Sequence, residues 1–490
     1  MTTMTLTEQL ADWATGLDLD DVPPRVVEFA KSQILSQLAA LRAGLSHPIG
    51  AAMTKAFGDP LQPDAKQAAC VLAALGTWLH FDDTVYAGHL SHSCVNVPLS
   101  YGRSLGLDGR SLLTAVIAAN ECAARVTAAA TLGALRGQGA AHQHLVGAVC
   151  GRLRCERAPA AHWVDALGLA FLMPPMPIRR AMWGSDAKVL SSYVPVRAGL
   201  DACDAAAAGL RGAPDILEHH EGFLAEFASV PLPEAVGGLG TRWHTETMSF
   251  KMHPGGPGID AAVDCAAALR ERIGGFRAED VAEIVVDCSL YTVFVDRRSR
   301  EYLDGPDSAP SSLIFSTPYI VATALLTGDV QAADFMAPRV REPTRWRLAE
   351  LVRLAHDEAM TRDTFVGTAP FGEALRQAGD RAKPWLTEFG GPELVELVGD
   401  LGAPSADFRT AEKLTGARVT VRMRDGRVFV DERDRPVGAA GPATRATHPE
   451  LVAAKFRATA GDPAVAEAVA ALDTLPAGEL GGLLSVALAP

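Results

Sequence analysis

A short stretch, His80 to His92, concentrates side chains that exchange protons. It reads HFDDTVYAGHLSH and holds three histidines, two adjacent aspartates, a threonine and a tyrosine. The segments on both sides of it are rich in Ala, Leu and Val. Titratable groups set into an apolar scaffold are typical of an active site. The alternative is an acidic turn between buried helices with hydrogen-bonded, inactive histidines, and the stretch favours the active site over it.

Spacing separates the roles within this stretch. Asp82 and Asp83 are neighbours, so in a helix they point about 100° apart, and one serves a site while the other supports a neighbour. His89 and His92 lie on one face if they are helical. No further ligand with suitable spacing is evident nearby, so we expect acid–base chemistry rather than a metal site. His80 closes an apolar helix and is either a site residue or a satisfied core histidine.

Further candidates follow along the chain. Thr84 either hydrogen-bonds a carboxylate or satisfies a helix end. His142 and His144 are two residues apart, so in a helix they diverge and at most one of them enters a given pocket. Arg136 lies beside two glycines that permit close approach of a carboxylate, although a glycine-rich helix start is the alternative.

Two lysines precede predicted helices. Lys188 occupies the first turn of an apolar helix, where the helix dipole disfavours a cation, so its placement suggests an anion to be bound. The alternative is a lysine that reaches solvent or Asp186. Lys251 and His253 come before a Pro/Gly run that leads into a helix, which is typical of a helix N-terminus at a cleft or of a hinge.

Composition restricts the class of protein. The chain has 490 residues, of which 48% are hydrophobic, and a net charge of −13. This excludes extended disorder and argues against a nucleic-acid partner, which needs a basic face. We see no signal peptide and no apolar run long enough to span a membrane. Eight scattered cysteines without a CxxC pair fit a reduced compartment, so we expect a soluble cytoplasmic protein.

Periodicity predicts the elements that position these side chains. Helices are predicted over 5–15, 26–43, 62–80, 93–105, 109–130, 137–155, 160–173 and 187–210, with a loop over 174–185. Strands are predicted over 281–288, 290–296, 417–423 and 427–430, and helices over 311–327, 343–357, 448–459 and 463–475. We therefore predict a mainly α fold with an α+β part. A large all-helical domain covers 1–270, a smaller α+β lid covers 271–435, and the helices of 436–490 return to the helical domain.

The order of motifs resembles that of the MmgE/PrpD family over nearly the whole chain. The motifs are FDDT, GHLSHS, GSDAK, PDILEHHEGF, SFKMHPG with GID, TPYIVATALLTG, RVTVRMRDGR and HPELVAAKF. The family includes 2-methylcitrate dehydratase, cis-aconitate decarboxylase and iminodisuccinate epimerase. The resemblance implies a homodimer and chemistry on di- or tricarboxylates, without cofactor or metal, in a cleft between the domains.

The resemblance also implies site residues. The catalytic set it suggests is Asp82, His89, His92, His144, Lys188, Lys251 and Tyr319, with one histidine of each closely spaced pair facing the substrate. Together with the candidates inferred from the residues themselves, the substrate-binding set is Thr84, His80, His142, Arg136 and His253. The chain departs from the family at His80, where many members carry an acid, and at Gly255–Gly256, where many carry Pro-x-Cys.

The expected function is that of a lyase acting on a small carboxylate. A histidine removes a proton α to the carboxylate, Lys188 and Lys251 hold the enolate charge, and Tyr319 or a second histidine donates a proton. We favour dehydration, as in 2-methylcitrate dehydratase, over decarboxylation or isomerisation. A metal-dependent hydrolase using His89, His92 and an aspartate is a remote alternative. A binding protein that has lost catalysis is another.

Overall fold

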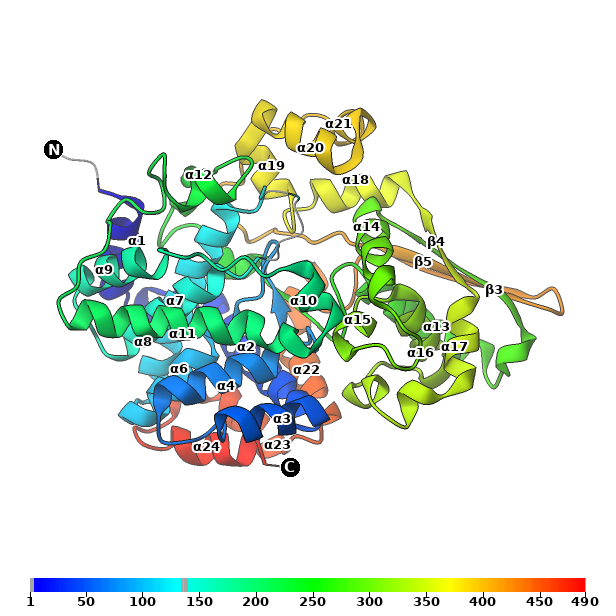
Figure 1. The fold of residues 1–490 in the computed structure, drawn as a ribbon, viewed down its shortest axis with the longest axis horizontal. Coiled ribbons are helices and arrows are strands. Elements are labelled where there is room, and N and C mark those ends of the chain that lie inside the picture. Colours follow the sequence, from blue (N-terminus) through cyan, green and yellow to red (C-terminus); the bar gives the residue numbers. More distant parts are fainter. Residues whose placement is uncertain (1–3, 134, 136–139, 490) are drawn as a thin grey trace.

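The computed structural model describes residues 4–133, 135 and 140–489, which form two parts side by side along the long axis of the molecule (Figure 1). One part is built of helices, and the other contains a four-stranded sheet with helices packed on it. The prediction of a mainly α fold with an α+β part is confirmed.

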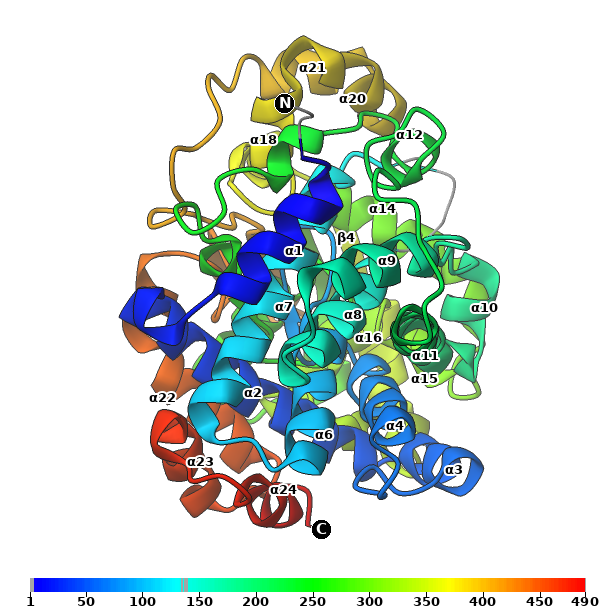
Figure 2. The ribbon, with the colours of Figure 1, turned by 90° about the vertical axis from the view of Figure 1, so that its left-hand side faces the viewer.

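The helical part is organised around α2 (Pro24–Leu45), α4 (Ala65–Thr77), α7 (Gly109–Ala129), α8 (Gln143–Cys155) and α11 (Leu190–Ala207). Helix α8 packs against both α7 and α11, and α11 packs against α4. The other helices here are α1 (Leu6–Gly16), α3 (Pro48–Phe57), α5 (Ser91–Cys94), α6 (Asn96–Leu105), α9 (Ala160–Ala170), α10 (Arg179–Gly184) and α12 (Phe223–Phe227). Figure 2 shows α1 and α9 at the end of the molecule, in front of α7 and α8.

Small side chains allow these helices to approach closely. A Cβ on Gly147 of α8 would meet the Ser93 hydroxyl at 2.2 Å, so only glycine fits between α8 and α5. Helix α7 has the length and apolar composition of a membrane span, but the residues of that apolar window are all buried inside the protein. It is therefore a core helix. All eight cysteines are buried and none forms a disulfide, as the sequence suggests.

The second part is a mixed sheet with the strand order β4-β3-β5-β6. Strand β3 (Val281–Cys288) is parallel to β4 (Val352–His356) and antiparallel to β5 (Ala417–Met423), which forms a hairpin with β6 (Val428–Arg433). Helices α13 (Asp260–Ile273) and α16 (Thr317–Thr327) pack on the sheet. The remaining helices are α14 (Leu290–Ser299), α15 (Pro310–Leu313), α17 (Pro343–Glu350), α18 (Glu358–Val366), α19 (Gly372–Ala378), α20 (Lys383–Gly390) and α21 (Pro392–Val398).

Some predicted elements are wrong. The segment 290–296 is the start of α14 rather than a strand, because Ser289 caps a helix by accepting a hydrogen bond from the Thr292 amide. The predicted helix over 343–357 ends at Glu350, and its last residues form β4 beside β3. Helices α3 and α10 lie where no helix was expected. Tertiary pairing overrides local propensity in such short segments.

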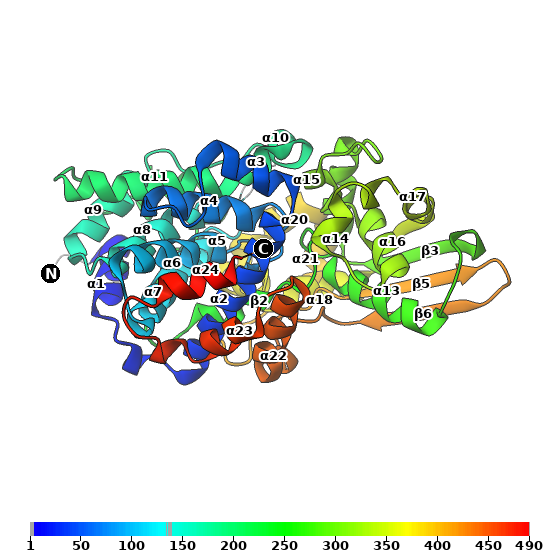
Figure 3. The same cartoon turned by 90° about the horizontal axis from the view of Figure 1, so that it is seen from below.

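The C-terminal segment returns to the helical part. Helices α22 (Pro442–Ala458) and α23 (Pro463–Ala470) pack on α2, and α24 (Leu480–Ala487) packs on α6. Figure 3, in which the molecule is seen from below, shows the three helices on the face turned toward the viewer. Helix α13, which a domain boundary at 270 would place in the helical part, packs on the sheet instead. The two parts are thus connected at 251–259 and again after β6.

Candidate active site

The stretch from His80 to His92 begins in the loop between α4 and α5 and ends inside α5. Its middle forms β1 (Asp83–Thr84), which pairs antiparallel with β2 (Ser249–Phe250). Val85 and Gly88 exchange two backbone hydrogen bonds of 2.9 Å and close a tight turn. His80 and Tyr86 have positive φ angles of 47° and 50°, a conformation that non-glycine residues adopt at a cost. Such backbone strain is concentrated at functional sites.

Asp83 anchors this loop to the helical core. Its side chain is fully buried and accepts hydrogen bonds from the Leu90 amide at 2.9 Å, from Gln33 Nε2 at 2.9 Å and from the Ser91 hydroxyl. Burial and the nearby charge of Asp82 raise its pKa, against the effect of these hydrogen bonds. With its acceptor atoms occupied, Asp83 supports the loop and does not face a ligand.

Asp82 holds two histidines. Its Oδ1 lies 3.0 Å from Nδ1 of His89, and its Oδ2 lies 3.0 Å from Nε2 of His92. Burial of Asp82 disfavours its charged form, but the two histidines outweigh burial and hold its pKa well below the ordinary value. An ionised carboxylate only accepts hydrogen bonds, so Nδ1 of His89 carries the proton and its Nε2 is left to take another. This arrangement prepares His89 to act as a base.

Four imidazoles follow one another across the site. His80 stacks on His89 with ring centroids 4.4 Å apart, His89 stacks on His92 at 5.3 Å, and His92 lies 5.3 Å from His144. Burial, assisted by neighbouring cationic groups, holds the pKa of both His80 and His144 well below the ordinary value. The two outer histidines are therefore neutral and flank the pair that Asp82 holds.

The four histidines line one cavity of about 160 Å³ between the two parts of the molecule. The wall includes polar groups of the loop, apolar side chains and one lysine. Its lining residues include Thr77, Thr84, Ser191, Lys413, Met182, Trp183, Tyr291 and Phe315. A small acid enclosed here would lie next to several proton-transfer groups and the Lys413 ammonium.

Lys413 is the lysine in this wall, and the sequence gives no sign of it. It lies between α21 and β5, and its Nζ donates a hydrogen bond to the Thr84 hydroxyl at 2.9 Å. Burial, opposed by Asp260 and assisted by Lys251, lowers its pKa to about 8. Its segment has no distinctive composition. Because Lys413 is far from Thr84 along the chain, the contact between them could not be predicted from the sequence. Lys413 is charged at neutral pH and is poised to lose that charge just above it.

The two lysines expected at the cleft lie behind the cavity wall. Lys188 donates a hydrogen bond to the carbonyl of Thr77, and burial, opposed by Asp82, lowers its pKa to about 7. Lys251 forms an ion pair of 2.5 Å with Asp260. Neither belongs to the lining of the histidine cavity.

Lys455 on α22 is a third buried lysine behind this wall that sequence reasoning missed. Its Nζ donates hydrogen bonds to the Ser36 hydroxyl at 2.7 Å and to the Phe81 carbonyl. Burial, with Asp82 and Asp83 opposing it, lowers its pKa to about 7. Lys455 lies within the HPELVAAKF motif, and that motif could have identified it in the sequence. Lys455 fixes the backbone from which the Asp82 side chain projects.

Other expected site residues lie elsewhere. Tyr319 is fully buried in the second part and donates its hydroxyl proton to the Asp334 carbonyl, so its expected place in the cleft needs correction. His142 packs between Phe223 and Phe227, at ring distances of 5.0 and 4.9 Å, and lines a neighbouring cavity. Arg136 lies outside the described residues.

His253 forms an ionic clamp rather than part of the histidine cavity, which corrects its expected contact with substrate. Its two ring nitrogens lie 3.0 Å from Asp329 and 2.9 Å from Asp264. Burial disfavours the charged ring, but the hydrogen bonds and charges of these carboxylates outweigh burial and raise its pKa to about 9. The clamp joins the end of α16 to α13.

Replacing this clamp should produce a pH-dependent loss of stability. Because the folded pKa of His253 exceeds its unfolded value, the stabilisation is complete below pH 6.5 and is lost as pH rises through 9. We expect the unfolding free energies of wild type and His253→Gln to differ by about 3 kcal/mol more at pH 6 than at pH 10. Denaturant titrations at both pH values measure this difference. The exposed-residue control, His220→Gln, should show none, and a pH-independent loss for His253→Gln would contradict the clamp.

Asp82, His89 and His92 also form a set that could hold a metal ion, because one ligand atom from each lies within 4.8 Å of the others. Two imidazoles and a carboxylate are a donor set that zinc accepts. In that arrangement the three side chains would serve as ligands, and Asp82 would no longer orient the base.

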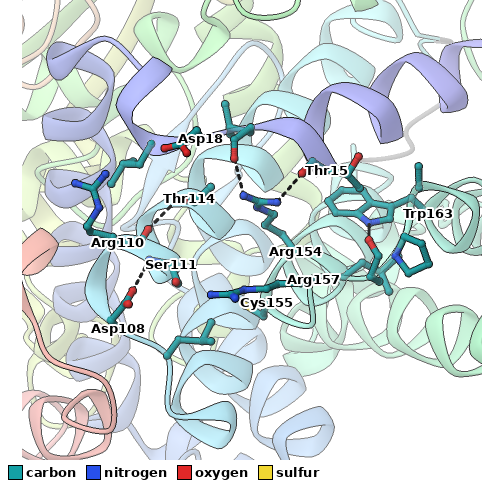
Figure 4. Close-up of a pocket in the computed structure, with 17 residues that line it drawn as sticks. Thr15, Asp18, Asp108, Arg110, Ser111, Thr114, Arg154, Cys155, Arg157 and Trp163 are labelled. Carbon is teal, nitrogen blue, oxygen red and sulfur yellow. Dashed lines mark hydrogen bonds between the residues drawn. The ribbon is translucent and has the colours of Figure 1, made fainter.

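A larger cavity, of about 690 Å³, lies elsewhere in the helical part (Figure 4). Three arginines, Arg110, Arg154 and Arg157, are among its lining residues. Arg154 is already used for structure, because it donates hydrogen bonds to the carbonyls of Thr15 and Leu17 at 2.9 and 2.5 Å. This cavity shares no described lining residue with the histidine cavity, so its size alone does not make it the active site.

Comparison with known proteins places the chain. The MmgE/PrpD N-terminal domain matches residues 8–234, and the MmgE/PrpD C-terminal domain matches residues 253–379. Two proteins named cis-aconitate decarboxylase, one from Aspergillus terreus strain NIH 2624 / FGSC A1156 and one from Aspergillus terreus, are each 24% identical to it. Each alignment covers 73% of this chain and 80% of the relative. The two domain matches follow one another over most of the sequence, and the chain belongs to the MmgE/PrpD family.

Proposed function

We propose that this protein is a lyase that removes a proton α to the carboxylate of a small acid. The observation that carries the proposal is the ionised Asp82 that fixes the tautomer of His89 in the wall of a cavity that also contains Lys413. Family membership and the two relatives named as decarboxylases support a lyase.

The reaction uses the groups that line the cavity. Nε2 of His89 takes the α-proton, and the electron pair left behind spreads into the carboxylate as an enolate. Lys413 and the Thr84 hydroxyl lie in the same wall and stabilise the negative charge that develops there. A base and an acid of this kind each contribute about 10²–10⁴-fold to the rate.

The leaving group decides the class of lyase. In dehydration, the enolate electrons form a C=C bond, the C–O bond to a β-hydroxyl breaks, and the proton that His89 took from the α-carbon passes to the departing hydroxyl, which leaves as water. In decarboxylation, no α-proton is removed: the C–C bond to a carboxylate breaks, CO₂ leaves, and the carbanion left behind is protonated. We favour dehydration, because the row of histidines offers donors for a leaving hydroxyl. The names of the relatives support decarboxylation as the alternative.

A metal-dependent hydrolase is the second candidate, favoured by the close approach of Asp82, His89 and His92. Metal analysis of the purified protein separates the two. Stoichiometric zinc, with activity lost on chelation and restored by zinc, would support the hydrolase. Activity that survives chelation supports the lyase.

The proposal is tested by incubating the protein with a panel of mono-, di- and tricarboxylic acids that carry a β-hydroxyl or β-carboxyl group. Proton NMR in D₂O follows α-proton exchange, new alkene signals and loss of carbon as CO₂. We expect exchange with at least one acid, followed by alkene formation from the hydroxy acid. Absence of exchange and of product with every acid would contradict the proposal.

Lys413 is expected to bind the substrate carboxylate. Lys413→Met should raise KM about 10- to 100-fold at pH 7, the effect of losing a charged hydrogen bond. Because the pKa of Lys413 is about 8, the wild-type KM should rise as pH passes 8, and the variant should lack this rise. Steady-state kinetics from pH 6.5 to 9.5 measure both effects. The exposed-lysine control, Lys383→Met, should behave as wild type, and an unchanged KM in Lys413→Met would refute the assignment.

A further inference from the structure

A second cavity adjoins the histidine cavity. It measures about 230 Å³ and shares the lining residues Ala87, Ala140 and Tyr291 with its neighbour. Sites for small organic molecules measure roughly 300–1,000 Å³. Neither cavity reaches this size alone, whereas the two joined across their common wall do.

The second cavity is walled by aromatic rings from both parts of the molecule. The rings are Phe227 of α12, Tyr291 and Phe294 of α14, Phe371 before α19, and Trp385 and Phe389 of α20. Phe294 and Phe389 stack at 5.2 Å, and Phe371 lies 5.6 Å from Trp385. An aromatic ring placed among them would gain edge and face contacts in addition to the burial of its apolar area.

One buried polar side chain of this cavity has no hydrogen-bond partner among the residues that the structure describes. His142 is 1% exposed, and neither of its ring nitrogens forms a hydrogen bond with a described residue. Burial lowers its pKa to about 3, so the ring is neutral and offers one donor and one acceptor. A buried polar group without a partner is costly, which points to a ligand or water as the missing partner.

We propose that the second cavity binds an aromatic arm of the substrate while the acid end reacts at His89. The substrate is then a carboxylic acid that bears an arylalkyl group, rather than a compact polycarboxylate. This inference rests on the proposed function, because it places the reacting carbon in the histidine cavity. The arm passes Ala87, where the two cavities meet.

Binding of two acids that differ only in the arm tests this inference. We expect calorimetry to show that wild type binds benzylsuccinate at least about 10-fold more tightly than succinate, because only the former fills the aromatic cavity. Ala87 is exposed, so Ala87→Phe should fold normally while its ring blocks the passage, and the preference should disappear. Ala208→Phe, the same change at an exposed position outside both cavities, should keep the preference.

Fluorescence gives a readout that does not depend on the Ala87 variant. Both acids lie near Trp183 of the histidine cavity, but only benzylsuccinate also reaches Trp385, so it should change the tryptophan emission of wild type more than succinate does, and Trp385→Phe should reduce its change to that of succinate. Equal affinity for the two acids, absent binding of benzylsuccinate, or a preference that survives Ala87→Phe would overturn the aromatic-arm site. These outcomes concern affinity alone, so they are separate from α-proton exchange, whose absence would contradict the lyase instead.

Discussion

Asp82→Asn is expected to lower kcat by about 10³-fold, the range expected when a catalytic histidine loses the group that sets its tautomer. In wild type the carboxylate accepts from Nδ1 of His89 and leaves its Nε2 free for the substrate proton. An asparagine can turn its amide group toward the ring and donate to Nδ1 instead, which places the proton on Nε2. His89 then presents a proton to the substrate and no longer acts as a base.

The shape of the side chain changes little in this substitution, so the fold should remain. Steady-state kinetics on the acid found by the NMR panel, together with circular dichroism and thermal melting, measure the two effects separately. We expect the melting temperature to shift by only a few degrees. A kcat within 10-fold of wild type would show that Asp82 does not orient the base.

Asp83→Asn is expected to cause a large loss of stability, and to lower kcat less than Asp82→Asn does. Both carboxylate oxygens of Asp83 accept hydrogen bonds, from the Leu90 amide, Gln33 Nε2 and the Ser91 hydroxyl, and of these donors the hydroxyl is the one that can turn to accept instead. An amide group in this place sets one N–H against another donor inside the protein. A buried unsatisfied donor costs about 1–3 kcal/mol, and two groups lose their partners, so we expect a loss of roughly 2–5 kcal/mol.

The two aspartates form a matched pair, because they are adjacent, equally buried and changed in the same way. Chemical denaturation should show the loss for Asp83→Asn and little change for Asp82→Asn. Where Asp83→Asn remains folded, its kcat should exceed that of Asp82→Asn. Unchanged stability of Asp83→Asn, with kcat as low as that of Asp82→Asn, would contradict the division of roles.

Much of the histidine cavity could be predicted from the chemistry of a single stretch. His80, Asp82, Thr84, His89 and His92 lie within thirteen residues, and the structure brings them together around a tight turn. Spacing could not say which aspartate faces the histidines, because the prediction assumed helical geometry and both aspartates lie outside any helix. The division was settled by the hydrogen bonds to Asp83 from Ser91 within the stretch and from Gln33, which belongs to a distant segment.

The residues that sequence reasoning missed or misplaced depend on long-range packing. Lys413 reaches Thr84 across the junction of the two parts, and nothing in its own segment marks it. Tyr319 and His253 were assigned through motifs, which fix order along the chain but not the direction of a side chain. Dependence on long-range packing also explains which elements of the fold could be predicted and which could not. Long periodic helices such as α7 were predicted within a residue, whereas β4 depends on pairing with β3.

The central claim is that His89, oriented by Asp82, removes one proton from the carbon α to a carboxylate. Proton NMR in D₂O on a responsive acid with two α-hydrogens tests it most directly, with wild type and His89→Gln compared at equal concentration. We predict that wild type replaces one of the two α-protons with deuterium stereospecifically and that His89→Gln, although folded, replaces neither. Exchange by His89→Gln at the wild-type rate would contradict the account.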